Sequence, residues 1–328
     1  MPNARFHLLV YGFVAVSLCV TYYYNCYMFS TWGPVDRDSV YTFRSFSRGL
    51  EEYCSSMRKE WRPRIFSNFL ASFVVKPTGT RHGFAEGVAA WNAAWLGLCF
   101  AIYLLWDPRK AAFLIFGTFA CLYYSFTIMA DRHIYPWDMP ALFFYCLLAF
   151  SAHRKMPLLI LAACLVGTGF KETVMLGSAV FLFRTEWPMK TRVAWAATTL
   201  LLCLLLKAGI DIFTYNQSIL FTMQTDSEGP LVMAGVTERG IWYNLRALGH
   251  VYLNHPVFIN GGRLLVFLLL PMRDDEDRMW KTVGVLFVAG NMLFADINEY
   301  RVFHEMIPIS LWSIYKHFSC RAGKEPPG

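Results

Sequence analysis

Long apolar segments recur along the whole chain, and this feature constrains the fold more than any other. The first begins near Phe6, and others follow at short intervals to about residue 318. A run of about 20 apolar residues crosses the hydrocarbon core of a bilayer as an α-helix. Because 56% of the 328 residues are hydrophobic and only 16% are charged, a large soluble domain has no room. The sequence therefore predicts a single integral membrane domain over residues 1–328.

Hydropathy predicts an all-α, polytopic transmembrane fold with about ten spans. The expected spans are 6–28, 84–106, 111–129, 138–153, 156–169, 172–184, 193–212, 257–272, 280–295 and 302–318. The first apolar stretch is too long for the core of a cleaved signal peptide, so we expect it to be retained as a span. The segments 156–169 and 172–184 are each short for a full crossing. We expect two helices that meet at Phe170-Lys171-Glu172, with one long helix as the alternative.

The distribution of Lys and Arg predicts the orientation of these spans. Most short-loop cations lie in 107–110, 153–155, 184–192, 273–281 and the tail 316–324. The positive-inside rule places such loops in the cytoplasm, together with both termini. The long loops 29–83 and 213–256 then face the periplasm of a bacterial inner membrane. Since the net charge of +7 is scattered among these loops, nucleic-acid binding is not expected.

The first outer loop contains a predicted amphipathic helix near residues 39–53. Val40, Phe43, Phe46 and Leu50 recur there at helical spacing, and charged residues occupy the other faces. Such a helix lies flat on the membrane surface, among the lipid headgroups.

Ionisable residues gather at the outer ends of the predicted spans. The candidate site residues are Asp36, Asp38, Arg62, Arg64, His133, Asp138, Lys171, Glu172, Glu299, Arg301 and Glu305. Charges at membrane depth are costly unless they are paired or hydrated, so those that persist usually line a cavity or a substrate path. Simpler alternatives are a paired hairpin tip at Lys171-Glu172, an i,i+4 salt bridge between Arg301 and Glu305, and headgroup contacts of the two arginines.

Asp36 and Asp38 follow the first span closely. Two carboxylates two residues apart can supply a general base, because a neighbouring charge or a nearly dry cleft raises the pKa of one of them. The alternative is the solvated start of a loop.

Four short strings carry a resemblance to a known family. They are Val35–Tyr41 (VDRDSVY), Tyr135–Phe144 (YPWDMPALFF), Phe170–Thr173 (FKET) and Glu299–Pro308 (EYRVFHEMIP). Their order, over roughly residues 5 to 310, resembles that of the GT-C superfamily of membrane glycosyltransferases, in which an acidic catalytic residue and a surface helix follow the first span. The chain differs from larger members by lacking a C-terminal soluble domain.

The resemblance implies an inverting glycosyltransferase of the cell envelope. It would move a sugar from a polyprenyl-phosphate donor, among membrane lipids, to a glycan, lipid or protein acceptor on the periplasmic face. Asp38, or else Asp36, would be the base.

The resemblance also implies roles for the charged residues of the cleft. Arg301, Lys171 and Arg62, Arg64 or His133 would neutralise the phosphate, whereas Glu172, Asp138 and Glu305 would orient the cations or hold sugar hydroxyls, and Glu299 would join the substrate site. No cofactor is firmly predicted; Mg or Mn stays open, since both favour oxygen ligands.

Two other functions fit part of the pattern. A transporter or flippase of a lipid-linked sugar or another anionic lipid would explain charges at membrane depth. Such proteins often show internal repeats and broken helices near the midplane, and the sequence has no convincing repeat. A non-catalytic scaffold of GT-C type is the third alternative.

Overall fold

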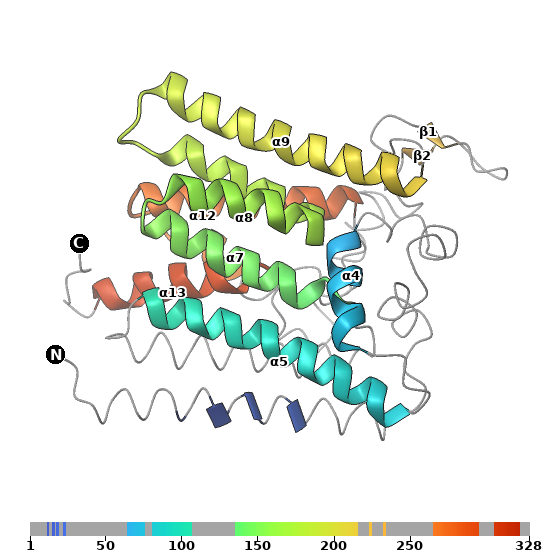
Figure 1. The fold of residues 1–328 in the computed structure, drawn as a ribbon. Helices are drawn as coiled ribbons and strands as arrows, with labels where there is room; N and C mark the ends of the chain where they lie inside the picture. The colour runs from blue at the N-terminus through green and yellow to red at the C-terminus, as the bar shows by residue number, and fades with distance from the viewer. Residues whose placement is uncertain are drawn as a thin grey trace.

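The computed structural model describes residues 64–75, 81–106, 135–215, 223–224, 232–233, 265–294 and 305–321, with single helical positions between Gly12 and Tyr23. Its elements are α4 (Ile65–Val74), α5 (Arg81–Trp106), α7 (Asp138–His153), α8 (Pro157–Phe170), η2 (Glu172–Phe183), α9 (Met189–Tyr215), β1 (Met223–Gln224), β2 (Val232–Met233), η3 (Leu265–Leu269), α12 (Asp275–Phe294) and α13 (Ile307–Arg321) (Figure 1). Apart from the two-residue antiparallel pair of β1 and β2, every described element is helical, which confirms the all-α class.

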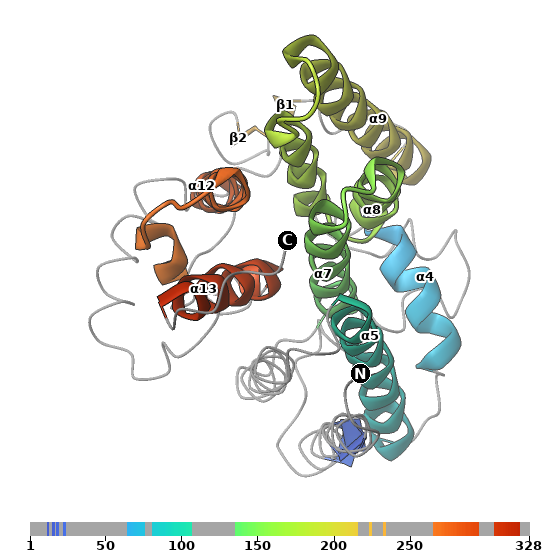
Figure 2. The same cartoon turned by 90° about the vertical axis from the view of Figure 1, so that its left-hand side faces the viewer.

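The long helices lie side by side in a bundle, and the short helix α4 crosses one end of it (Figures 1 and 2). Within the bundle α7 packs between α5 and α8, and η2 packs against α8, α9 and α12. The interior is apolar, with fully buried side chains such as Leu142, Tyr145, Phe181 and Phe287. Burial of this apolar surface between helices fixes where the charged helix ends meet.

Several helices coincide with the predicted spans. The helix α7 matches 138–153, α5 and α9 are slightly longer than predicted, and α12 and α13 are displaced by a few residues. Two described helices are long and apolar enough to cross a membrane, namely α5 over Glu86–Trp106 and α9 over Met189–Thr214. The total of about ten spans stays a prediction; 6–28 is described only at scattered positions, 111–129 lies outside the described residues, and the first half of 257–272 also lies outside them.

The junction at Phe170-Lys171-Glu172 is present as predicted. The helix α8 ends at Phe170, Lys171 is extended with φ −153° and ψ 128°, and η2 begins at Glu172 as a 3-10 helix. The two short segments are therefore separate helices, and the alternative of one long helix is wrong. Close packing holds them together, because a Cβ on Gly167 would lie 2.5 Å from a methyl carbon of Val174.

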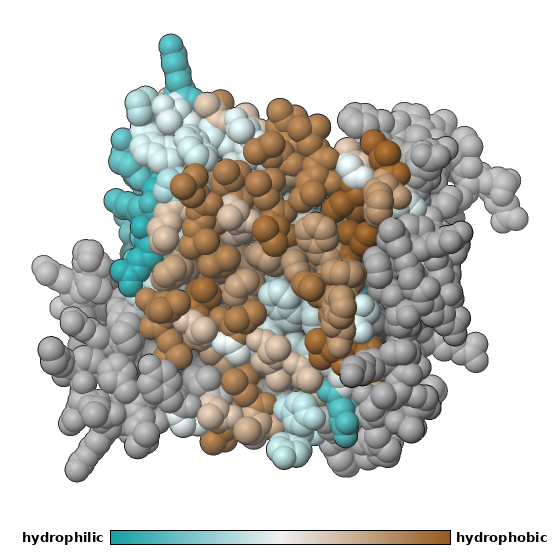
Figure 3. Space-filling model, in the orientation of Figure 1, coloured by the Kyte–Doolittle hydropathy of each residue, from teal (hydrophilic) through white to brown (hydrophobic). Residues whose placement is uncertain are grey.

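One face of α9 carries exposed apolar side chains along its length. They include Val193, Leu201, Leu205, Ile212 and Phe213, each 48% to 63% exposed. Figure 3 shows a broad continuous apolar area on the described surface, with hydrophilic residues along one edge. An apolar outer face on a helix of this length suits contact with lipid chains.

The helix α4 was not predicted from the sequence, which treats its residues as part of the loop 29–83. Ser67, Asn68 and Ala71 face the protein, whereas Phe69 and Phe73 are exposed and contact each other edge to face at 4.9 Å. Its polarity is thus the reverse of a helix on a soluble protein, as expected for a helix that faces lipid. The predicted surface helix at 39–53 lies outside the described residues.

Replacing Gly87 by alanine is expected to lower stability. Its added Cβ would lie 2.9 Å from Val75 Cα and 3.1 Å from the Val74 carbonyl oxygen, both backbone atoms at the end of α4. Overpacking of this kind costs about 1–3 kcal/mol, which unfolding in mixed micelles would measure. Gly290→Ala is the matched control, because its Cβ meets nothing within 4 Å and should stabilise α12 by roughly 0.5–1 kcal/mol. Equal effects of the two changes would contradict the close approach.

A network of polar and aromatic side chains lies at the end of the bundle opposite α4. The His153 ring packs between Trp106 and Trp312, with centroid distances of 5.5 Å and 5.0 Å. The Glu276 carboxylate accepts hydrogen bonds from Trp312 Nε1 at 2.9 Å and from Lys316 Nζ at 3.1 Å. These contacts join the ends of α5, α7, α12 and α13 at the side predicted to be cytoplasmic. Since α7 runs from Asp138 to His153, this network lies roughly 23 Å from the start of α7.

Candidate functional site

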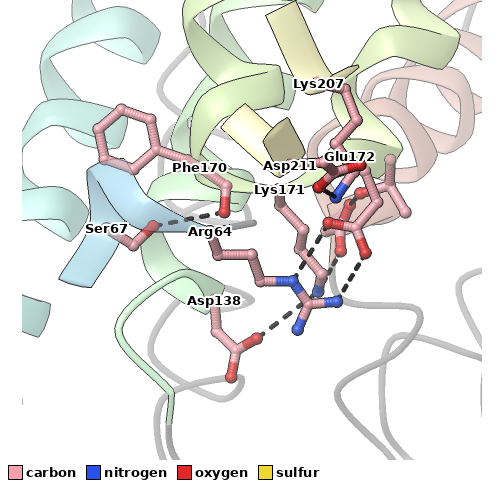
Figure 4. Close-up of polar contacts among 10 residues, drawn as sticks. Arg64, Ser67, Asp138, Phe170, Lys171, Glu172, Lys207 and Asp211 are labelled. Atoms are coloured by element: carbon pink, nitrogen blue, oxygen red, sulfur yellow. Dashed lines mark hydrogen bonds and ion pairs between the residues drawn. The ribbon is translucent and has the colours of Figure 1, made fainter. Parts of the chain in front are cut away.

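Five of the eleven predicted site residues meet at one end of the bundle. They come from four places in the chain: Arg64 before α4, Asp138 at the start of α7, Lys171 and Glu172 at the junction of α8 and η2, and Glu305 just before α13 (Figure 4). Each lies at or next to a helix terminus, so the bundle brings together residues that are far apart in sequence. Asp36, Asp38, Arg62, His133, Glu299 and Arg301 lie outside the described residues, and their placement stays a prediction.

Lys171 is held between two carboxylates. Its Nζ lies 2.5 Å from Glu305 Oε1 and 3.6 Å from Asp138 Oδ1. The exposed fractions of these side chains are 11% for Lys171, 1% for Glu305 and 2% for Asp138. The extended backbone at Lys171 matters here, because it interrupts the helix and directs the chain into the cluster. A cation in so dry a place persists only when it is paired, and Lys171 is paired with both acids.

Hydroxyl groups fix the orientation of the acids. The Thr173 hydroxyl donates a short hydrogen bond to Glu305 Oε2, and the Tyr145 hydroxyl donates to the Thr173 carbonyl at 2.7 Å. Asp138 Oδ2 accepts a hydrogen bond of 3.4 Å from the Tyr135 backbone N–H. Asp138 also lies in the first turn of α7, where the helix dipole favours a negative charge. The two acids are therefore preorganised around the ammonium group.

Arg64 and Glu172 form a second ion pair beside the first. Arg64 Nη2 lies 2.7 Å from Glu172 Oε1, and Nε lies 3.2 Å from Oε2, so the contact is bidentate. The guanidinium also lies 4.5 Å from the centroid of the Trp137 ring, which is stacked on Tyr135 at 4.7 Å. At 18% and 35% exposed, Arg64 and Glu172 are more open than the Lys171 group.

The carboxylates of both ion-pair groups, Glu172 in one and Asp138 and Glu305 in the other, act on Arg64. Arg64 precedes α4 and lies outside the two long apolar helices. Burial by itself would lower the pKa of Arg64, but the Glu172 carboxylate, followed by Asp138 and Glu305, raises it above its ordinary value. Arg64 is therefore a permanent cation that couples the exposed pair to the buried one.

Sequence reasoning missed a third pair, Lys207 and Asp211 in α9. Lys207 Nζ lies 3.4 Å from Asp211 Oδ1, and the Asp211 side chain is fully buried. Both residues lie beside Glu172 and interact with it electrostatically (Figure 4). Two ionisable residues at i and i+4 within an otherwise apolar helix are the signal that could have found them.

The site combines three cations with four carboxylates at the mouth of an apolar bundle. Within the described ranges, no group of three or more His, Cys, Asp or Glu side chains is arranged to hold a metal ion. Each described carboxylate of the site is instead paired with Arg64, Lys171 or Lys207. Such a set of paired charges can bind an anion by exchanging a carboxylate partner for the anion.

Comparison of the chain with protein-family models, with curated proteins and with solved structures gives no match.

Proposed function

We propose that the chain is a multi-pass membrane glycosyltransferase of GT-C type, which transfers a sugar from a polyprenyl-phosphate donor with inversion at the anomeric carbon. The observation that supports this most strongly is the position of Lys171 between Asp138 and Glu305, next to the Arg64–Glu172 pair. The sequence predicts that these residues bind substrate, and they lie together at one end of an apolar bundle.

The chemistry of such a donor matches this environment. A prenyl chain needs apolar surface, which the outer faces of α4 and α9 offer. Its phosphate needs cations, and guanidinium groups bind phosphate oxygens in a bidentate, charge-assisted manner. Fixed cations also stabilise the negative charge that grows on the phosphate as the glycosidic bond breaks.

The location of the charges favours an enzyme over a transporter. Substrate sites of secondary transporters lie near the bilayer midplane, where broken helices meet. Here Asp138 begins α7, Glu172 begins η2, and Lys207 and Asp211 lie in the last turns of α9. A site at the helix ends is accessible from one side of the membrane. That is sufficient for a transfer reaction, whereas transport needs access from both sides in turn.

The proposed base is Asp38 or Asp36, in the predicted outer loop 29–83, which also contains Arg64. It would take the proton from the acceptor hydroxyl as that oxygen attacks the anomeric carbon and the lipid phosphate leaves. Because Arg64 is paired with Glu172, this loop is anchored to the site at residue 64. Lys171 would stabilise the leaving phosphate through the field of its buried ammonium group.

Asparagine at the catalytic aspartate is expected to abolish transfer. Membranes carrying the wild type, Asp36→Asn or Asp38→Asn would be supplied with radiolabelled polyprenyl-phosphate sugars, and incorporation into acceptor would be measured. Loss of general base catalysis lowers the rate by about 10²–10⁴-fold, in one variant and not the other.

Glu276→Gln, at the far end of the bundle, is the control and should retain transfer. Detergent solubilisation separates the alternatives further, because transfer continues without a sealed membrane whereas transport does not. Transfer that is indifferent to both aspartates, or absent with every donor, would contradict the proposal.

A further inference from the structure

The Arg64–Glu172 pair is the most open part of the charged cluster. Glu172 is 35% exposed and Arg64 is 18% exposed, whereas Lys171 and its two acids are 11% exposed or less. An anionic group that approaches from outside therefore meets Arg64 before it meets Lys171. At that point Arg64 is already occupied by a carboxylate.

The occupying contact has the geometry of phosphate recognition. Both oxygens of Glu172 are bound, one to Nη2 and one to Nε of the same guanidinium. A phosphate group presents two oxygens to arginine in the same parallel arrangement. A phosphodiester also carries one negative charge, as the carboxylate does, so an exchange would leave the charge beside Arg64 unchanged.

Glu172 has a second cation within reach. The charge of Lys207 acts on Glu172 from α9, and Asp211 holds that ammonium in place at 3.4 Å (Figure 4). Lys171 offers no comparable exchange, because its two partner acids are almost completely buried. Glu172 is thus a partly exposed carboxylate that interacts with two cations, Arg64 before α4 and Lys207 in α9.

We propose that Glu172 is an internal placeholder for the phosphate of an anionic lipid, and that Lys207 receives its carboxylate when that lipid binds. In the protein without lipid, Glu172 accepts hydrogen bonds from Nε and Nη2 of Arg64 and keeps the guanidinium oriented over Trp137. When the lipid phosphate arrives, it takes both nitrogens of Arg64, and Glu172 turns toward Lys207. Lys207 and Asp211 are then positioning residues, and the substrate class rests on the function proposed above.

The proposal predicts that Glu172→Gln binds the lipid phosphate more tightly than the wild type. Farnesyl methyl phosphate, a short phosphodiester with one negative charge, serves as the probe, and calorimetry on the purified full chain in detergent measures its affinity. Removing a competitor that occupies the site most of the time should lower the dissociation constant by about tenfold or more. Arg64→Lys, which cannot form the bidentate contact, should weaken binding, and Glu172→Gln should not improve it in that background.

Glu172→Asp distinguishes exchange from simple repulsion. It keeps the charge but shortens the side chain, so its hold on both nitrogens weakens and the probe should again bind more tightly. If the probe binds more tightly to Glu172→Gln but not to Glu172→Asp, only charge repulsion was removed, and the proposal is overturned. Glu276→Gln makes the same chemical change in the network at the other end, and it should leave the affinity unchanged.

The role of Lys207 is tested with its partner neutralised at the same time. Lys207→Gln combined with Asp211→Asn removes the pair without leaving a lone buried charge. This double change should weaken the probe when Glu172 is present and have no effect when residue 172 is glutamine. Weakening of equal size in both backgrounds would show that Lys207 binds the phosphate directly, which overturns the placeholder mechanism.

The outcomes separate this mechanism from the proposed enzyme. If Glu172→Gln binds the probe equally or less tightly, or neither form binds it, the placeholder is wrong, even where the wild type still transfers sugar. If the tightening occurs but no donor supports transfer, the exchange stands as part of an anionic-lipid site with another function.

Discussion

Replacing Lys171 by methionine is expected to lower the free energy of unfolding by about 3–5 kcal/mol, the usual cost of breaking a buried ion pair from one side. Methionine keeps most of the volume of the side chain but removes its charge. Asp138 and Glu305, both at most 2% exposed, would then lose the ammonium group that lies within 3.6 Å of each of them. We expect sugar transfer to be lost as well, because the same ammonium group would act on the leaving phosphate. Unfolding in mixed micelles measures the first effect, and the radiolabel assay measures the second.

A rescue experiment separates the two consequences. Adding Asp138→Asn and Glu305→Gln to Lys171→Met removes the negative charges of both acids. Much of the free energy of unfolding should then return, while transfer stays lost. Lys190→Met, at an exposed position in the first turn of α9, is the matched control and should change neither property. If Lys171→Met were as stable as Lys190→Met, the buried ion pairs of Lys171 with Asp138 and Glu305 would not stabilise the fold.

Much of the site was predictable because charge is scarce in this sequence. Lys171 and Glu172 stand between two strongly apolar runs, and Asp138 opens another, so each marks both a helix end and a candidate site. The structure agrees at these places because a charged side chain favours the end of an apolar helix over its middle. The pairing of each acid with its cation was not predictable from the sequence. It depends on packing between segments that are distant in the chain, as with Glu305 and Lys171.

Two features escaped the sequence for identifiable reasons. The helix α4 is only ten residues long, and Ser67 and Asn68 on its buried face make the segment look like a polar loop. Lys207 and Asp211 were included in an apolar span, because hydropathy averaged over a long window hides two charged residues among many apolar ones. Both omissions border the site, where local patterns are most often broken for function.

The network at the other end of the bundle should make stability depend on acid. Glu276 lies in the first turn of α12, ahead of the predicted span 280–295, and it is 23% exposed. Burial alone would raise its pKa, but the hydrogen bond to His153 and the charge of Lys316 outweigh burial and lower the pKa to about 2, from an ordinary 4.5. A carboxyl group whose pKa falls on folding stabilises the folded state above its ordinary pKa and loses that contribution as the pH approaches the lowered value.

We therefore expect the wild type to lose up to about 3 kcal/mol of unfolding free energy through Glu276 between about pH 4.5 and pH 2, since one pKa unit corresponds to ~1.4 kcal/mol. Unfolding in mixed micelles at a series of pH values gives the profile, and Glu276→Gln isolates the residue from the other acids that titrate in this range. The variant should start less stable than the wild type at neutral pH, because Lys316 loses a charged partner, and the two profiles should converge toward pH 2. Parallel profiles over the whole window would show that the contacts of Glu276 with His153 and Lys316 do not stabilise the fold. Convergence would show that this network, which joins α5, α7, α12 and α13, holds together the end of the bundle opposite the site.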